Sequence, residues 1–280
     1  MGDNLKSDAF RDCYVKWYKE NQGKPFWDAD VPSLDYDLLN SLIITAFQNG
    51  GEDSRTGILA HALDYWIARE FERAGFSIEG VWPRSVKPYV VDPEILCSDI
   101  SKNRRVKDAS DVLITSCGKA NANIMGSAYV KQVDVGMSSW LAGPELLVST
   151  KTMSGSFGKN LANRFEEAYG DVKNLRDRHP LAAHGFFFLA DDSIQSESAS
   201  FSKLVHMLHR LQRPGNVYDA TALLLYRRDT LDEIELISPT STGSTGDISP
   251  ESFFETLIRI VLENAPEGIH VRAREIYPFE

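Results

Sequence analysis

An aspartate and a lysine stand close together in the middle of the chain, in a segment rich in strand-forming residues. Asp134 lies in the run SAYVKQVDVGM and Lys151 in the run ELLVSTKTM, with SSWLAGP between them. Two such runs joined by a short loop with Gly and Pro predict a β-hairpin. With a loop over 138–143, Asp134 lies opposite 147–149, and Lys151 follows on the same face at about 3.3 Å per residue. The spacing therefore predicts that both side chains point into one pocket.

A carboxylate beside an ammonium group suits phosphodiester hydrolysis. The carboxylate holds a hard divalent cation such as Mg²⁺, which polarises the phosphate and activates water. The ammonium group positions that water and offsets negative charge on the reacting phosphorus oxygens. Lys151 follows the apolar run LLV, so its stem is expected to be partly buried, which is typical of a functional lysine. The alternative is an ordinary cross-strand salt bridge between Asp134 and Lys151.

These residues resemble the PD-(D/E)xK nuclease superfamily, whose hairpin carries Asp on one strand and (D/E)-x-K on the next. The resemblance covers roughly the middle and later part of the chain. It implies a Mg²⁺-dependent endonuclease, with one or two ions, that cleaves double-stranded DNA. Val133 stands where the family often has Pro, and Ser149 stands where it has Asp or Glu. Serine ligates magnesium poorly, so a second acid must come from elsewhere or the site is inactive; Ser149 itself orients water or is simply a small residue under the site.

The resemblance offers a second acid from the helix that follows the hairpin. A subgroup that resembles enzymes cutting CCGG-type sites uses Ser-x-Lys and then an acid about a dozen residues on. Here the Ser-Thr-Lys run at 149–151 is followed by Glu166 with fourteen residues between, and Glu167 is the fallback. Glu166 is expected to border the core as a catalytic metal ligand. The alternative is a surface acid that pairs with Asn163 or Lys173.

A third acid, Glu70, lies in the strongest predicted helix, 56–74. Its spacing places it on the apolar stripe with Trp66, where an acid needs a partner. In the superfamily that the chain resembles, a glutamate from the helix before the hairpin often joins the metal site. The alternative for Glu70 is an i,i+3 pair with Arg73. Glu72 lies off the stripe and is expected to be solvated.

Four basic residues are candidates for contact with DNA. Lys159 and Arg164 lie near the site and are expected to contact phosphate, with a solvated loop and helix as the alternative. Arg176 and Arg178 belong to the run NLRDR, and arginine reads guanine by bidentate bonds. The interpretation that we favour for this pair is a helix C-terminus, where cations interact well with the helix dipole.

Hydrophobic periodicity predicts a mixed α/β fold with a central sheet flanked by helices, and the resemblance implies that this sheet is restriction-endonuclease-like. We expect a helical N-terminal part over 1–54, a nuclease core over 55–235 and a C-terminal extension over 236–280. The region 91–121 is predicted to hold a helix, PEILCSDI, and a strand or buried segment, DVLITSCG. The remaining predicted helices are 6–20, 35–48, 160–177, 200–212 and 249–265, and the remaining predicted strands are 76–83, 127–137, 145–153, 184–190, 220–228 and 234–238.

The composition sets wider limits on function. A net charge of −10 counts against a protein that coats nucleic acid, but a sequence-reading enzyme needs only a local basic cleft. The three cysteines are scattered, which favours reduced thiols and a cytoplasmic location. The resemblance suggests a bacterial restriction or phage-defence enzyme, acting as a homodimer or higher homo-oligomer. The alternatives are an inactive DNA-binding relative, a repair or junction nuclease, and an unrelated α/β interaction protein.

Overall fold

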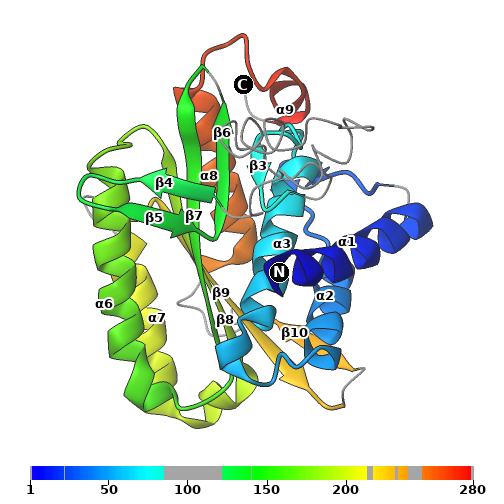
Figure 1. Ribbon diagram of the computed structural model, residues 1–280, viewed down its shortest axis with the longest axis vertical. Helices are drawn as coiled ribbons and strands as arrows, with labels where there is room; N and C mark the ends of the chain where they lie inside the picture. Colours follow the sequence, from blue (N-terminus) through cyan, green and yellow to red (C-terminus); the bar gives the residue numbers. More distant parts are fainter. Residues whose placement is uncertain are drawn as a thin grey trace, which may run out of the picture.

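The computed structural model describes residues 2–21, 23–84, 122–139, 141–212, 217–230, 233–238 and 248–278. Within these ranges the fold is mixed α/β, as predicted, with helices on both faces of a six-stranded sheet (Figure 1). The predicted elements within 91–121 lie outside the described residues. No helix in the described ranges has the length and apolar character needed to cross a membrane.

The central sheet has an antiparallel half and a parallel half. Its strands are β3 (Val81–Trp82), β6 (Val135–Ser139), β7 (Gly143–Met153), β8 (Ala183–Asp191), β9 (Ala220–Arg228) and β10 (Ile234–Ile237), in the spatial order β10-β9-β8-β7-β6-β3. β3, β6 and β7 pair antiparallel, β7, β8 and β9 run parallel, and β10 is antiparallel to β9. Parallel neighbours need a crossover connection, and helices α6 (Phe157–Arg176) and α7 (Ser198–Gln212) supply two of them.

Two hydrophobic cores lie on opposite faces of this sheet. Helices α2 (Tyr36–Gln48), α3 (Ile58–Arg73) and α8 (Pro250–Asn264) pack on one face, and α1 (Gly2–Asn21) contacts α2 and α3. Helices α6 and α7 pack on the other face, as Figure 1 shows. The first core draws on residues of all three predicted parts of the chain. The division into those parts stays a prediction.

Alternate residues of β7 face the two cores. Leu146 and Val148 belong to the core with α3, and Met153 belongs to the core with α6 and α7. Side chains on a strand alternate with a period of two. Thr150 therefore faces α3, and Lys151 faces α6.

Smaller elements flank the main sheet. A two-stranded hairpin of β4 and β5 lies beside α6 and covers a third, small cluster around Val133 and Leu175. A second short hairpin, of β1 and β2, precedes α2. The bounds are β1 Trp27–Asp28, β2 Val31–Pro32, β4 Ala122–Met125, β5 Val130–Val133, η1 Ser54–Thr56, η2 Asp192–Ser196 and α9 Val271–Ile276.

Most predicted helices and strands are confirmed within a few residues, with two corrections at the hairpin. The run 127–137 is not one strand, because β5 pairs with β4 and β6 pairs with β7, and the chain changes partner at Asp134. The predicted loop 138–143 is too long, because Ser138 and Ser139 still pair with Pro144 and Gly143 across a register shift. The parallel pairing of 146–153 with β8 comes from residues far along the chain.

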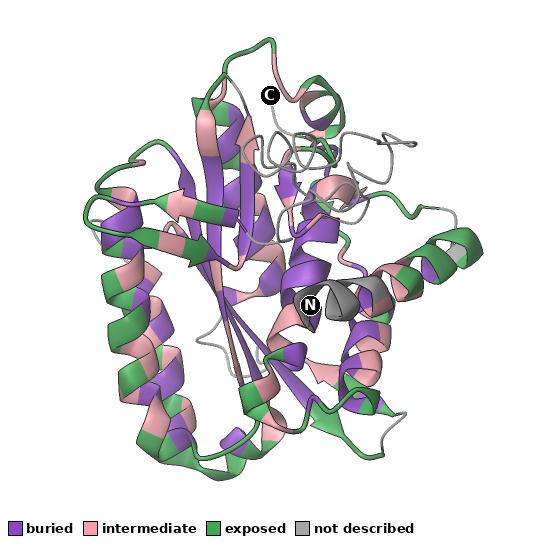
Figure 2. Ribbon diagram, viewed as in Figure 1, coloured by how far each residue is buried: buried purple, intermediate pink, exposed green. Residues whose placement is uncertain are grey.

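Helix α3 is buried on nearly all sides, so its charged residues must find partners inside the protein (Figure 2). Arg69 is fully buried and its Nη2 lies 2.6 Å from a Glu72 carboxylate oxygen. The prediction that Glu72 is solvated is wrong, since its side chain is only 10% exposed. Burial raises the pKa of Glu72 to about 7, and the positive charge of Arg69 opposes that rise.

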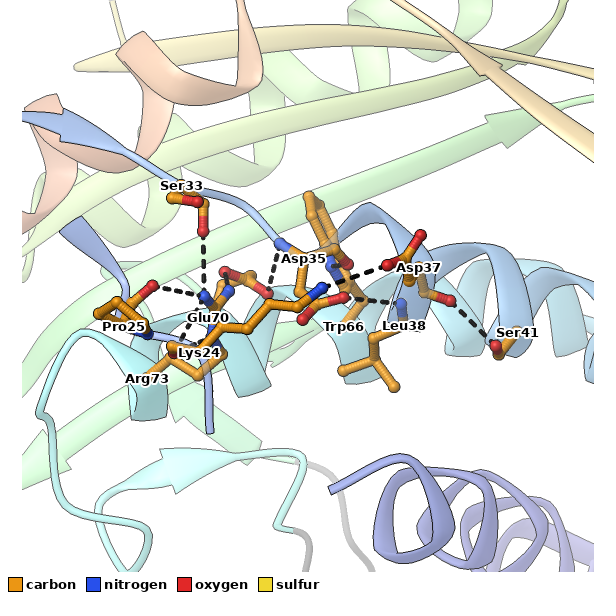
Figure 3. A network of polar contacts seen from close by, with 10 residues as sticks. All are labelled: Lys24, Pro25, Ser33, Asp35, Asp37, Leu38, Ser41, Trp66, Glu70 and Arg73. Carbon is orange, nitrogen blue, oxygen red and sulfur yellow. Dashed lines mark hydrogen bonds and ion pairs between the residues drawn. The ribbon is translucent and has the colours of Figure 1, made fainter. Parts of the chain in front are cut away.

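Glu70 is part of a polar network that joins α3 to the N-terminal segment (Figure 3). Its carboxylate accepts hydrogen bonds from Arg73 Nη1 at 2.5 Å and from the Asp35 amide at 3.3 Å. Arg73 Nη2 also donates to the carbonyl oxygens of Pro25 and Ser33, at 2.9 and 3.0 Å. The i,i+3 alternative for Glu70 is therefore present in the structure, and the network holds the 24–35 segment against α3.

We predict that Arg73→Met destabilises the protein strongly. The substitution leaves the fully buried Glu70 carboxylate without its cation, and breaking a buried pair in this way costs about 3–5 kcal/mol. Urea unfolding measures the change. The control, Arg259→Met, removes a pair with Glu263 in which both side chains are about half exposed, and costs at most about 0.5 kcal/mol. Equal, small losses in the two variants would contradict the role assigned to the network.

Candidate active site

The candidate site lies where β6 begins and β7 continues past it. The last antiparallel pair at this end is Val135 with Val148, so Asp134 is level with Ser149, as predicted. In the described part of the chain, β7 pairs only with β8 beyond that point. The Thr150 amide therefore faces an open strand edge, and it donates a hydrogen bond to Asp134 Oδ2 at 2.9 Å.

A second carboxylate reaches the same residue from α3. The hydroxyl of Thr150 donates to Asp64 Oδ1 at 2.5 Å, and both side chains are buried. The other Asp64 oxygen lies 3.8 Å from Nδ1 of His61, one helical turn earlier. Asp64 and Asp134 thus bond to neighbouring atoms of one threonine, although they are 70 positions apart in the sequence.

The negative charge of Asp64 opposes the ionisation of Asp134. Burial and the negative charge of Asp64 raise the pKa of Asp134 to about 7. The Thr150 amide and the positive charges of Lys151 and Lys131 act in the opposite direction without cancelling the rise. The negative charge of Asp64 near Asp134 is a charge that a bound cation would offset.

Lys151 approaches from the other face of β7. Its side chain is 24% exposed, and its Nζ lies 4.0 Å from Glu167 Oε2 on α6. Glu167 is also held by Arg164 Nη1 at 3.0 Å. The contact that the structure records for Lys151 is with Glu167, whereas its effect on Asp134 is through space. The simple alternative of a direct Asp134–Lys151 salt bridge is therefore not the observed arrangement.

The acid of α6 that lies beside Lys151 is Glu167, the fallback, and not Glu166. Glu166 is exposed, so the expectation that it borders the core is wrong. The physical reason is the helix phase. Leu161, Ala168 and Val172 form the buried side of α6, and Glu166 points away from that side.

Ser149 points toward the buried hydroxyl of Tyr218. That tyrosine donates its own hydrogen bond to the Ala168 carbonyl oxygen at 3.1 Å. Ser149 is thus one of the small residues beneath the site, between β7 and α6. This environment matches the interpretation of Ser149 as a small residue under the site.

A further ion pair borders the site on the hairpin side. Lys131 Nζ on β5 lies 2.5 Å from Asp171 Oδ2 on α6, and Tyr129 Oη donates to the other oxygen of Asp171 at 3.1 Å. Glu167 and Asp171 are four residues apart on α6, so one face of this helix presents two acids to two lysines. Neither Lys131 nor Asp171 is among the residues predicted from the sequence.

Glu70, the third predicted acid, lies in a different environment. Its contacts are with Arg73 and the Asp35 amide, six residues further along α3 than Asp64. The acid of α3 that meets Asp134 at Thr150 is Asp64, which the sequence analysis missed. The signal was available, because ILAHALDYWIAREF is apolar around most of the helix. A helix of that kind is buried on all sides, so Asp64 as well as Glu70 is expected to need a polar partner inside the protein.

The four candidate DNA contacts divide into two groups. Lys159 and Arg178 are exposed. Arg164 is bound to Glu167, and Arg176 Nη2 lies 2.6 Å from Asp219 Oδ2 while its Nε donates to the Val217 carbonyl. Arg176 therefore ties the end of α6 to the start of β9. This structural role fits the helix C-terminus interpretation.

The donor set suits a hard divalent ion that keeps much of its water. The described residues contain no group of three or more His, Cys, Asp or Glu side chains arranged to hold a metal. Magnesium is commonly held by one or two carboxylates, with water and substrate phosphate oxygens completing its shell. Asp64 and Asp134 are two such carboxylates: each uses one oxygen for Thr150, and the other Asp64 oxygen lies 3.8 Å from His61 Nδ1.

We predict that Asp134→Asn stabilises the protein above neutral pH. Because the pKa of Asp134 is raised to about 7 in the folded state, ionisation destabilises the fold as pH rises from about 4 to about 7. Asparagine accepts the Thr150 hydrogen bond without the charge, so the gain at pH 8 is about 1–3 kcal/mol and shrinks toward pH 4. Chemical denaturation at both pH values measures it. The exposed acid Asp177, changed to Asn, serves as the control; a loss of stability in Asp134→Asn at pH 8 would contradict the burial of an unneutralised charge.

Comparisons with known proteins add no relative to this picture. No family model, curated protein or solved structure matched the chain. The interpretation of the site therefore depends on its own residues and geometry.

Proposed function

We propose that this protein is a metal-dependent endonuclease that hydrolyses phosphodiester bonds of double-stranded DNA. One observation carries the proposal: the buried carboxylate of Asp64 and the half-buried carboxylate of Asp134 both bond to Thr150, and the positive charge of Lys151 acts on Asp134 through space. An ordinary sheet has no reason to bury two acids together, because their mutual repulsion and desolvation both oppose folding.

The residues that would hold the ion are Asp64 and Asp134. A divalent cation bound there would polarise the scissile phosphate and activate a water molecule. The protein's own contribution is to keep the two carboxylates oriented and largely out of bulk water, where their charge acts more strongly. Lys151, on the neighbouring face, would offset the negative charge that develops on the phosphate oxygens and would orient the attacking water.

The order of elements also supports the proposal. Among the described elements, α3 and β3 precede the β4–β5 hairpin, and the antiparallel strands β6 and β7, helix α6 and the parallel strand β8 come after it. The resemblance implies a core of this kind, and here Asp134 directly precedes β6 while Lys151 lies on the adjacent strand β7. We propose that Asp64, from the preceding helix, supplies the acid that Ser149 does not. The departure at Ser149 then changes where the second ligand comes from.

The same proposal includes the substrate contacts. Lys159 is exposed at the start of α6, and Arg164 lies one turn further along the helix. We propose that both contact phosphates of DNA bound near Lys151. Such local positive charge is compatible with a net charge of −10, since a cleaving enzyme needs affinity only at its cleft. A restriction or phage-defence role, a homodimeric assembly and a cytoplasmic location remain predictions from the resemblance.

A DNA-binding protein without cleavage is the second candidate. The observation in its favour is Ser149, which leaves the family motif without its strand acid. The two functions differ in one measurable respect. Only the nuclease needs Lys151 for a chemical step, whereas either needs cationic residues for binding.

We predict that Lys151→Met abolishes DNA cleavage without unfolding the protein. Loss of a cationic group that stabilises the transition state lowers the rate by about 10²–10³-fold. Nicking of plasmid DNA in Mg²⁺ measures the rate, and circular dichroism verifies the fold. Lys173→Met, which removes an exposed α6 lysine paired with Asp177, is the control and retains activity. Cleavage by Lys151→Met at the rate of the unmodified protein would contradict the proposal, as would metal-independent cleavage.

We also predict that Glu167→Gln weakens cleavage and that Glu166→Gln does not. Glu167 lies beside Lys151 and Arg164, so its loss lets the lysine side chain move, at a cost of about tenfold in rate. The adjacent, exposed Glu166 gives a matched control on the same helix. Plasmid nicking by both variants decides the point. A larger loss of cleavage rate in Glu166→Gln than in Glu167→Gln would contradict this prediction and favour Glu166 as the functional acid of α6.

A further inference from the structure

Thr150 contacts both Asp64 and Asp134. It lies on β7 between Ser149 and Lys151, it is 4% exposed, and both of its hydrogen-bond donors are used. The amide donates to Asp134 Oδ2 at 2.9 Å, and the hydroxyl donates to Asp64 Oδ1 at 2.5 Å. One residue therefore contacts the strand acid and the helix acid at the same time.

The geometry of a threonine suits this task. The amide belongs to a strand that is paired with β8 from Leu146 to Met153, so its direction is fixed by the sheet. The branched side chain restricts χ1, which fixes the direction of the hydroxyl as well. Two like charges close together repel, and without such anchors they would turn apart. Each carboxylate bonds to Thr150 through one oxygen, so the direction of its second oxygen is set as well.

We propose that Thr150 is a positioning residue that sets the separation and orientation of the Asp64 and Asp134 carboxylates for a divalent ion. The inference rests on the proposed function, since that function gives the acid pair its purpose. The inference goes beyond the proposed function because it assigns the spacing of the two carboxylates to a neutral residue, which needs no contact with the metal or the substrate. Residues that orient metal ligands in this way typically change metal affinity about 10–100-fold when removed.

Substitutions at Thr150 separate positioning from ordinary packing. Thr150→Val keeps the amide, the volume and the branching and removes only the hydroxyl, whereas Thr150→Ser restores the hydroxyl. Thr221→Val is the matched control. Thr221 is a buried threonine of β9 in the same sheet, and its hydroxyl donates to Gln212 Oε1 at 2.9 Å, away from the acids.

The experiment measures binding of Mn²⁺ to the full chain by calorimetry, together with plasmid nicking as a function of Mn²⁺ concentration. We expect Thr150→Val to raise the dissociation constant for Mn²⁺ by about 10–100-fold and to shift the metal dependence of cleavage by the same factor. Thr150→Ser should bind within about threefold of the unmodified protein, because the donor is restored. Thr221→Val should lose stability but bind Mn²⁺ normally.

The outcomes distinguish this inference from the proposed function. If Mn²⁺ binds and Thr150→Val weakens it, but no variant cleaves DNA, the positioning role stands and the nuclease proposal fails. If the protein cleaves DNA and Thr150→Val binds Mn²⁺ as tightly as before, the positioning role is overturned and the nuclease stands. Equal weakening by Thr150→Val and Thr221→Val would also overturn it, as would absence of Mn²⁺ binding to the unmodified protein.

Discussion

Two carboxylates brought together at Thr150, one buried and one half-buried, are the interaction on which the candidate site depends. Removing an acid from water costs free energy, and placing a second acid beside it costs more. The raised pKa of Asp134 is the electrostatic sign of that cost. A protein that retains such a pair gains something else from it, and binding of a hard cation is the chemistry that two carboxylates and a nearby lysine serve best.

The rest of the fold makes this meeting possible. Because the chain changes partner at Asp134, from β4 with β5 to β6 with β7, the Thr150 amide is left open at the strand edge. Because α3 is buried on nearly all sides, Asp64 reaches the face of β7 that Thr150 occupies. The buried acids of α3 differ in the partners that they contact. Glu70 is neutralised by a guanidinium group, while Asp64 has a hydroxyl and, at 3.8 Å, a histidine nitrogen.

The sequence predicts most of the elements and half of the site. Strand alternation and a short loop placed Asp134 opposite 147–149, and the observed level at Ser149 depends on a register shift after Met137 that the sequence did not reveal. The helix acids were harder because their direction depends on packing between distant elements. Glu70 was predicted because it lies on the apolar stripe of α3, but most of that helix has no solvent-exposed side. On α6, the residue beside Lys151 is Glu167 and not Glu166. The pairing of Lys131 with Asp171 had no local signal, because it joins a hairpin to a helix across 40 residues.

Locating a bound ion tests the central claim most directly. Crystals grown with Mn²⁺ and measured at a wavelength where manganese scatters anomalously would show its position without reference to activity. The account predicts one strong peak with an oxygen of Asp64 and an oxygen of Asp134 both within about 2.0–2.6 Å. A peak coordinated elsewhere, or Asp64 and Asp134 with no ion between them at saturating Mn²⁺, would contradict it.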